Sequence, residues 1–227
     1  MGKPEFLELL AFRLGPLTVG TTVLTTWLVM GVLLFAAWLG SRNLSIESPP
    51  RFQSALEGIV MALRQAIEEA APGHGARLLP FIGTLWLFIV LANLIGLVPG
   101  FSSPTGDLSL TMALSLLVFV SVHWFGIRID GLRSYLKHYL DPNPILLPFH
   151  LLGEISRTLA LAIRLFGNMM SLEMAALLVL MVAGFLAPVP LLMLHIIEAL
   201  VQAYIFGMLA LVYIAGALQS HELQHKE

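Results

Sequence analysis

The sequence predicts an all-α integral membrane protein with about five transmembrane helices. Of its 227 residues, 58% are hydrophobic and only 11% are charged, and the mean hydropathy is +0.88. A water-soluble domain usually carries about 25% charged residues to cover its surface. Lipid must therefore cover part of this chain, and we expect residues 1–227 to form a single membrane domain.

Three uncharged segments predict the first three spans. Residues 17–40 exceed the ~20 residues that cross a ~30 Å hydrocarbon core. Because this segment is too long for the hydrophobic region of a signal peptide, we expect it to remain as an anchor. Residues 78–98 and 108–127 are the next candidates, and Asp107 is placed to cap the third helix at its N-terminus.

Residues 51–71, between the first two spans, have a different pattern. Apolar side chains recur there at helical spacing, whereas the charged side chains fall on other faces. The apolar set is Phe52, Leu56, Ile59, Val60, Leu63 and Ile67. We expect an amphipathic helix that lies on the membrane surface or against a partner, with a solvated loop helix as the alternative.

Residues 149–183 and 188–219 predict two long final spans that form a polar-lined hairpin. The intervening segment 184–190 separates them because it contains a glycine and two prolines. Basic residues concentrate in the connectors 42–79 and 128–147. By the positive-inside rule, this distribution predicts an outside N-terminus and a cytoplasmic C-terminus.

Charge, cysteine content and motifs exclude several classes of function. The formal net charge of −2 gives no basic surface for nucleic acid. The chain has no cysteine, and its seven histidines show no zinc-site spacing, so we expect no metal site. No nucleotide-binding motif occurs, and we expect neither a cofactor nor catalytic residues.

Arg164 is the most informative residue because it lies about three turns from the nearest polar connector, inside an apolar run. A central arginine costs roughly 2.5–3.5 kcal/mol on membrane-insertion scales and usually marks an ion or substrate pathway. Arginine keeps its proton in practice, so it acts as a fixed positive charge rather than as a proton relay. The structural alternatives are an ion pair with an acidic neighbour inside the bundle or a side chain that snorkels to the interface, and the depth of Arg164 disfavours the second.

Polar residues on the last two helices are the other candidates. Glu173 should not neutralise Arg164, because it lies nine residues later on the opposite helix face. His195, Glu198 and Gln202 form a stripe on the last helix, and antiparallel pairing puts Glu173 level with His195. A carboxylate facing an imidazole indicates an ion path or, alternatively, a buried network that locks two helices together. For Glu198 both interpretations stay open.

Three further polar residues flank Arg164 on its helix. Asn168 follows by one turn on the same face and is placed to hydrogen-bond a ligand carboxylate or a water. Glu154 and Arg157 are three residues apart, a spacing at which opposite charges can neutralise each other. A structural and a functional role are both open for that pair.

The stretch Arg164-Leu-Phe-Gly-Asn168 with Glu173, His195 and Gln202-Ala-Tyr-Ile-Phe206 resembles subunit a of F-type ATP synthases. The segments Pro104-Thr-Gly-Asp-Leu-Ser-Leu-Thr111 and Glu154-Ile-Ser-Arg157 also look like that family, so the resemblance covers residues 80–215. Glu198 is not a usual landmark of the family. The short N-terminus is another difference, which points to a divergent branch such as the N-type ATPases, some of which move sodium.

The resemblance implies a stationary ion-channel subunit that makes no ATP itself and passes H+ or Na+ through two half-channels. Arg164 then corresponds to the essential arginine that faces a rotating ring of c-subunit proteolipids. Glu173, His195, Asn168 and Gln202 match positions associated with the half-channels and the surroundings of the arginine. The implied partners are the c-ring, peripheral-stalk subunit b and membrane lipid, in a bacterial inner membrane.

Two rival functions remain at this point. A self-contained secondary transporter or channel needs its own substrate site, often with paired broken helices, but the chain shows no internal repeat. A structural membrane scaffold would have no need of a deep arginine such as Arg164.

Overall fold

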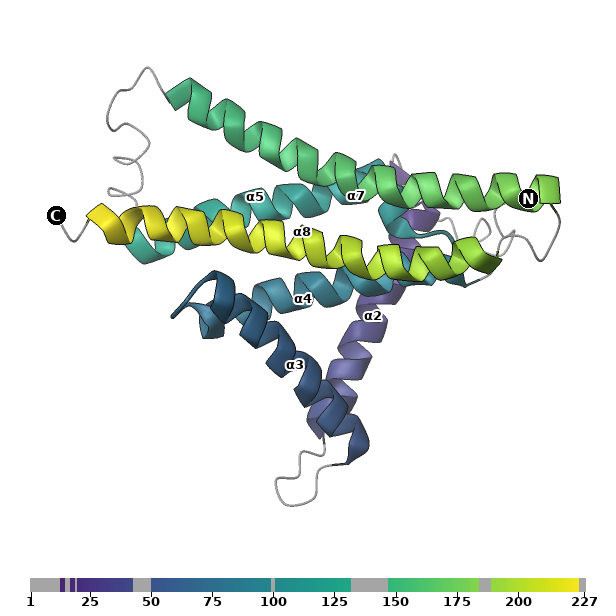
Figure 1. The fold of residues 1–227 in the computed structure, drawn as a ribbon, viewed down its shortest axis with the longest axis horizontal. Coiled ribbons are helices and arrows are strands. Elements are labelled where there is room, and N and C mark those ends of the chain that lie inside the picture. Colours follow the sequence, from purple (N-terminus) through teal and green to yellow (C-terminus); the bar gives the residue numbers. More distant parts are fainter. Residues whose placement is uncertain are drawn as a thin grey trace.

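The computed structural model is an α-helical bundle with five helices that are long and apolar enough to cross a membrane (Figure 1). This confirms the predicted all-α membrane fold. The segments predicted to separate the third span from the fourth and the fourth from the fifth lie largely outside the described residues. The structure describes residues 13–14, 17–18, 20–42, 50–98, 101–131, 147–183 and 189–224.

Six α-helices and two short 3-10 turns make up most of the described chain. The helices are α2 (Thr21–Arg42), α3 (Arg51–Ala70), α4 (Gly75–Leu94), α5 (Leu108–Asp130), α7 (Leu147–Ala183) and α8 (Val189–Gln224). The 3-10 turns η1 (Ile95–Leu97) and η2 (Pro104–Gly106) belong to the connection between α4 and α5.

The main departure from the predicted spans is at the start of the first one, where a helix is expected from residue 17. Two-residue strands, β1 (Arg13–Leu14) and β2 (Leu17–Thr18), instead form a small antiparallel hairpin. The helix begins only at Thr21, directly after Gly20. Hydropathy does not distinguish these two outcomes, because leucine and threonine fit both a strand and a membrane helix.

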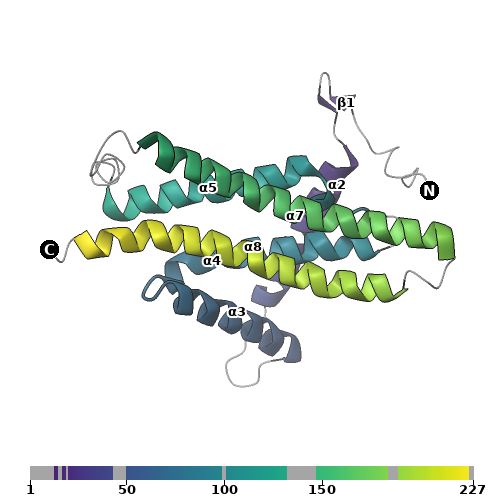
Figure 2. The ribbon, with the colours of Figure 1, turned by 45° about the horizontal axis from the view of Figure 1, so that its top comes forward.

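Helices α4, α5, α7 and α8 pack into the central bundle, and α7 and α8 form its long antiparallel hairpin (Figure 2). Buried apolar side chains from all four helices make one core. Representative members are Ile89 of α4, Val118 of α5, Leu165 of α7, and Phe206 and Leu211 of α8. The two ends of the bundle are referred to below as the turn end, where α4 connects to α5, and the far end, where α5 ends and α7 begins.

The α4–α8 contact depends on a glycine. The Trp86 indole of α4 stacks on Tyr204 of α8 and donates its N–H to the Tyr204 carbonyl at 3.3 Å. A Cβ at Gly207 would overlap the Trp86 ring, so only glycine permits this approach. The close contact fixes how α8 and its polar stripe lie against α4.

Helices α2 and α3 lie outside the central bundle, with α2 crossing it steeply (Figure 1). Helix α3 has the predicted amphipathic pattern, and its buried Ile67 joins the core. Phe52, Ile59 and Val60 on its apolar face remain exposed in the isolated chain. Most apolar side chains of α2 are exposed as well, as expected of a helix covered by lipid or by a partner.

Candidate functional site

Arg164 lies near the middle of α7, and its side chain is exposed. The neighbouring Ala162 and Leu165 are fully buried in the core. Within the described part of the chain, no carboxylate forms an ion pair with the guanidinium. The structural alternative, an arginine neutralised inside its own bundle, therefore finds no support among the described residues.

One helical turn from Arg164, an amide pair joins the two long helices. Asn168 of α7 donates a 2.8 Å hydrogen bond from Nδ2 to Oε1 of Gln202 on α8. Gln202 is buried, and its Nε2 has no hydrogen-bond partner in the part of the chain that the structure describes. Because an unsatisfied buried donor costs about 1–3 kcal/mol, this amide is suited to binding a water or a ligand oxygen.

Glu173 reaches the turn end of the bundle and is half-buried there. The backbone N–H of Ser103, just before η2, donates a 3.0 Å hydrogen bond to its Oε1. Its other oxygen, Oε2, lies beside Gly106, where an added Cβ would come within 3.3 Å. The carboxylate is therefore held against the α4–α5 connection and not against Arg164, as its position on the helix predicts.

His195 of α8 is buried at the same end, within electrostatic range of Glu173. Its Nε2 lies 3.4 Å from the backbone oxygen of Asn93 on α4. A carbonyl oxygen can only accept, so Nε2 is the donor in this contact. The structure thus brings Glu173 and His195 together through the α4–α5 connection.

Glu198 and Asp107 differ in how they are held. Glu198 is half-buried on α8 and has no polar partner among the described residues. Asp107 caps α5, as predicted, because its Oδ1 accepts from the Ser109 N–H at 2.9 Å. Its Oδ2 also accepts a 2.9 Å hydrogen bond from Thr22 Oγ1, so Asp107 ties α2 to the bundle.

Comparison with known proteins bears on what this arrangement does. The family model described as ATP synthase A chain matches residues 23–215. ATP synthase subunit a 2 of Pelobacter propionicus is 68% identical over 93% of this chain and 92% of its own length. ATP synthase subunit a of Legionella pneumophila is 56% identical over 99% and 97%, and ATP synthase subunit a 1 of Hahella chejuensis is 63% identical over 91% and 88%.

The chain belongs to the ATP synthase A chain family. The family match runs from the third residue of α2 to near the end of α8, so it includes every candidate residue named above. Membership confirms the family predicted from the sequence and places the chain among the non-catalytic membrane subunits of ATP synthases. The roles of single residues rest on the geometry.

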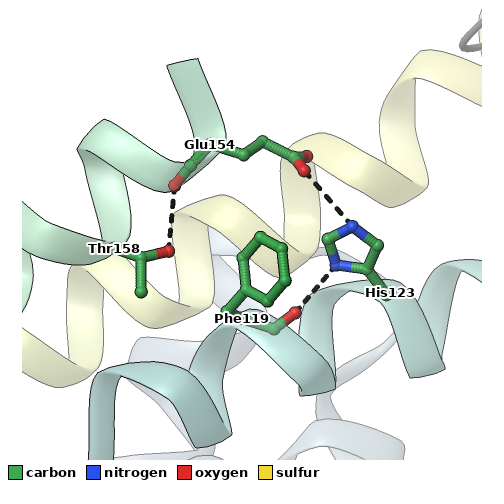
Figure 3. A network of polar contacts seen from close by, with 4 residues as sticks. All are labelled: Phe119, His123, Glu154 and Thr158. Atoms are coloured by element: carbon green, nitrogen blue, oxygen red, sulfur yellow. Dashed lines mark hydrogen bonds and ion pairs between the residues drawn. The ribbon is translucent and has the colours of Figure 1, made fainter. Parts of the chain in front are cut away.

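Of the interpretations left open for Glu154 and Arg157, mutual neutralisation is not what the described structure has, because the two side chains do not pair with each other. Glu154 points toward α5, where its Oε2 lies 3.2 Å from Nε2 of His123 (Figure 3). Arg157 lies over the ring of Tyr213 on α8, 5.2 Å from its centre. The spacing allows the two side chains to meet, but each contacts a different neighbouring helix instead, Glu154 contacting α5 and Arg157 contacting α8.

Sequence reasoning missed His123 as a site residue. Its Nδ1 lies 2.8 Å from the Phe119 carbonyl within α5, which leaves Nε2 directed at Glu154 (Figure 3). The Thr158 hydroxyl in turn donates to the Glu154 carbonyl at 2.9 Å. A histidine near the end of a predicted span gives no signal by itself, because its partner is set by the packing of α5 on α7.

Proposed function

We propose that the chain is the stationary ion-channel subunit of a rotary F-type ATP synthase, which carries H+ or Na+ between two half-channels and a ring of c-subunit proteolipids. The observation that carries this proposal is the exposed, permanently charged Arg164, which has no acidic partner among the described residues. Family membership supports it.

The mechanism follows from the cost of charge in lipid. A ring subunit carries a carboxyl group that must be neutral while it faces the hydrocarbon. Beside the fixed charge of Arg164 its ionised form is favoured, so it releases its ion there. Arg164 also repels cations and so prevents direct leakage between the two paths.

Glu173 and His195 supply the path on the turn-end side, which we assign to the outside because the basic residues concentrate in the other connectors. An ion that enters there neutralises the ring carboxylate, and the ring can then rotate into lipid. Each ion crossing releases roughly 2.3 kcal/mol per 100 mV of membrane potential, so several crossings are needed for each ATP. Asn168 and Gln202 line the region beside Arg164, with Glu198 on the same stripe.

The exposed apolar faces of α2 and α3 fit the remaining partners. Trp27, Leu34 and Phe35 of α2 are all well exposed in the isolated chain. We assign these faces to membrane lipid and to peripheral-stalk subunit b, in a bacterial inner membrane with the C-terminus in the cytoplasm. The polar side of α3 then faces the cytoplasm.

Arg164→Ala in the whole ATP synthase, reconstituted in liposomes, tests the proposal. Ion-driven ATP synthesis should be lost while assembly is retained, because only the fixed charge has been removed. Arg64→Ala on the exposed surface of α3 is the matched control and should leave synthesis nearly unchanged. Near-normal synthesis in the assembled Arg164→Ala complex would reject the role given to Arg164.

The transporter alternative is tested with the purified chain alone. A self-contained transporter or channel conducts ions without other subunits, whereas a half-channel subunit needs the ring to connect its two paths. Ion flux into liposomes that contain only this chain would therefore favour the alternative, and its absence, together with flux through the complex, would favour the proposal.

A further inference from the structure

We propose that the connection between α4 and α5, with Asn93, positions the ion path by holding the Glu173 carboxylate and the His195 ring in one fixed arrangement. This inference rests on the proposed function of those two residues and adds positioning residues to it. The positioning residues are Asn93, Ser103, Thr105 and Gly106.

The first step concerns which carboxylate oxygen exchanges the ion. The Ser103 N–H occupies Oε1 of Glu173, and a hydrogen bond to an ionised group is worth more than one between neutral groups. Oε2 lies beside Gly106, whose N–H donates instead to the Ser103 carbonyl. The geometry therefore assigns ion exchange to Oε2.

The second step concerns space around the carboxylate. An added Cβ at Gly106 would lie 3.3 Å from Oε2, and one at Gly96 would lie 3.0 Å from the Ser103 Cβ and 3.4 Å from Oε1. Neither glycine has a positive φ, so what favours glycine at both positions is proximity rather than backbone conformation. A side chain at Gly106 would shift the Glu173 carboxylate away from its present position.

The third step concerns the rigidity of the connection. Ser103 Oγ donates to the Ala92 carbonyl at 2.9 Å and lies 2.6 Å from Thr105 Oγ1. Thr105 Oγ1 donates to Oδ1 of Asn93 at 2.6 Å, and all three polar side chains are buried. Each hydroxyl has one proton, and with these donors the connection is bonded to α4 at two places, the Ala92 carbonyl and Asn93 Oδ1. The Ser103 amide is thus fixed relative to α4.

The fourth step extends this network to α8. Asn93 donates from Nδ2 to the Ala199 carbonyl at 3.2 Å, and its backbone oxygen lies 3.4 Å from Nε2 of His195. Because Nε2 is directed at Asn93, the other ring nitrogen, Nδ1, is left for the ion path. One residue of α4 therefore sets the position of α8 and the orientation of the imidazole.

Two substitutions at Ser103 separate the contribution of its backbone N–H from that of its hydroxyl. Ser103→Pro removes the N–H, and the observed φ of −62° already suits proline. Ser102 lies in a non-helical stretch, which suits the residue before a proline. Ser103→Ala removes the hydroxyl but keeps the N–H. The difference between the two variants therefore reports on the amide bond to Glu173.

Passive ion flow through the whole complex, with its catalytic sector removed, is measured in liposomes as a function of pH. Ser103→Pro should lower the flow about tenfold relative to Ser103→Ala, the factor expected for losing a hydrogen bond to a charged group. It should also move the midpoint of the pH profile, which loss of packing alone would not move. Glu173 and His195 are the titratable groups that face this region.

Equal flow and equal pH midpoints in the two assembled Ser103 variants would overturn the positioning role. If Ser103→Pro does not assemble, Gly106→Ala decides, with Gly31→Ala on α2, where an added Cβ meets nothing within 4 Å, as control. Parental flow in Gly106→Ala would then overturn the role. Unchanged flow in Glu173→Gln would instead refute the proposed ion path itself, so the two failures are distinguishable.

Discussion

Both ends of the bundle carry a carboxylate and a histidine, but the two pairs are held in different ways. At the far end Glu154 and His123 contact each other directly at 3.2 Å, with 21% and 27% of their side chains exposed. At the turn end Glu173 and His195 are bound instead to backbone groups of the α4–α5 connection and of Asn93. The Glu154 carboxylate and the His123 ring are bound to each other. The backbone contacts of Glu173 and His195 engage Oε1 and Nε2, and so leave Oε2 and Nδ1 for other partners.

Arg164 lies between these two pairs. Glu154 is ten residues before it and Glu173 nine residues after it, which corresponds to ~15 Å and ~13 Å along the helix axis. The comparison teaches that similar side chains on one helix make different contacts when their surroundings differ. In the proposed function the turn end exchanges ions, whereas the contact of Glu154 with His123 at the far end joins α7 to α5.

The largest expected effect is a difference in ion flow between variants of the two carboxylates, Glu173 and Glu154. Glu173→Gln should reduce passive flow through the complex by well over tenfold, because it removes the exchanging oxygen of the proposed path. Glu154→Gln should reduce it far less, since that carboxylate pairs with His123. The measurement is proton or sodium uptake by liposomes that contain the complex. An equal or larger loss in Glu154→Gln would reverse the functional contrast between the ends.

The fold itself was predictable because its signals are local. Uncharged segments longer than the hydrocarbon thickness give the first three spans, long and mostly apolar segments give the last two, and the apolar stripe between the first two spans gives α3. The hairpin β1–β2 was not predictable, since Leu17 and Thr18 suit a strand and a membrane helix equally. Only Gly20 indicates that the helix begins later.

The candidate site was predictable only where one helix sets the relation between residues. The spacing of Arg164 and Glu173 keeps them apart, as the structure has it. Ser103 and Thr105 gave no signal because their role depends on how α7 and α4 approach the connection. For the same reason the interhelical contact of His123 could not be read from its own segment.

A smaller effect, on the free energy of unfolding, distinguishes the Glu154–His123 pair from the Glu173–His195 pair. The single variants His123→Gln and Glu154→Gln, with the double variant, form a cycle that measures the coupling of their direct contact. We expect a coupling free energy of about 1–2 kcal/mol between His123 and Glu154, because water only partly screens a charge-assisted hydrogen bond between partly exposed groups. The midpoint of thermal unfolding in detergent is the readout. The matched cycle of Glu173→Gln and His195→Gln should give a smaller coupling, since no direct hydrogen bond joins them in the described structure.

A coupling in the Glu173–His195 cycle as large as that of the far-end pair would mean that the two groups interact directly. The distinction between anchoring to the backbone and pairing between side chains would then fail.

The smallest expected effect concerns support of the turn end by α2. Thr22 donates across to Asp107, whereas Thr26, one turn later, donates to the Thr22 carbonyl of its own helix. Thr22→Val should therefore lower the free energy of unfolding by about 0.5–1 kcal/mol, and Thr26→Val by less, since only the first removes a bond between elements. Thermal unfolding of the two variants is compared in the same detergent. Equal losses would indicate that α2 stabilises the connection through packing alone, and that Asp107 acts only as the cap of α5.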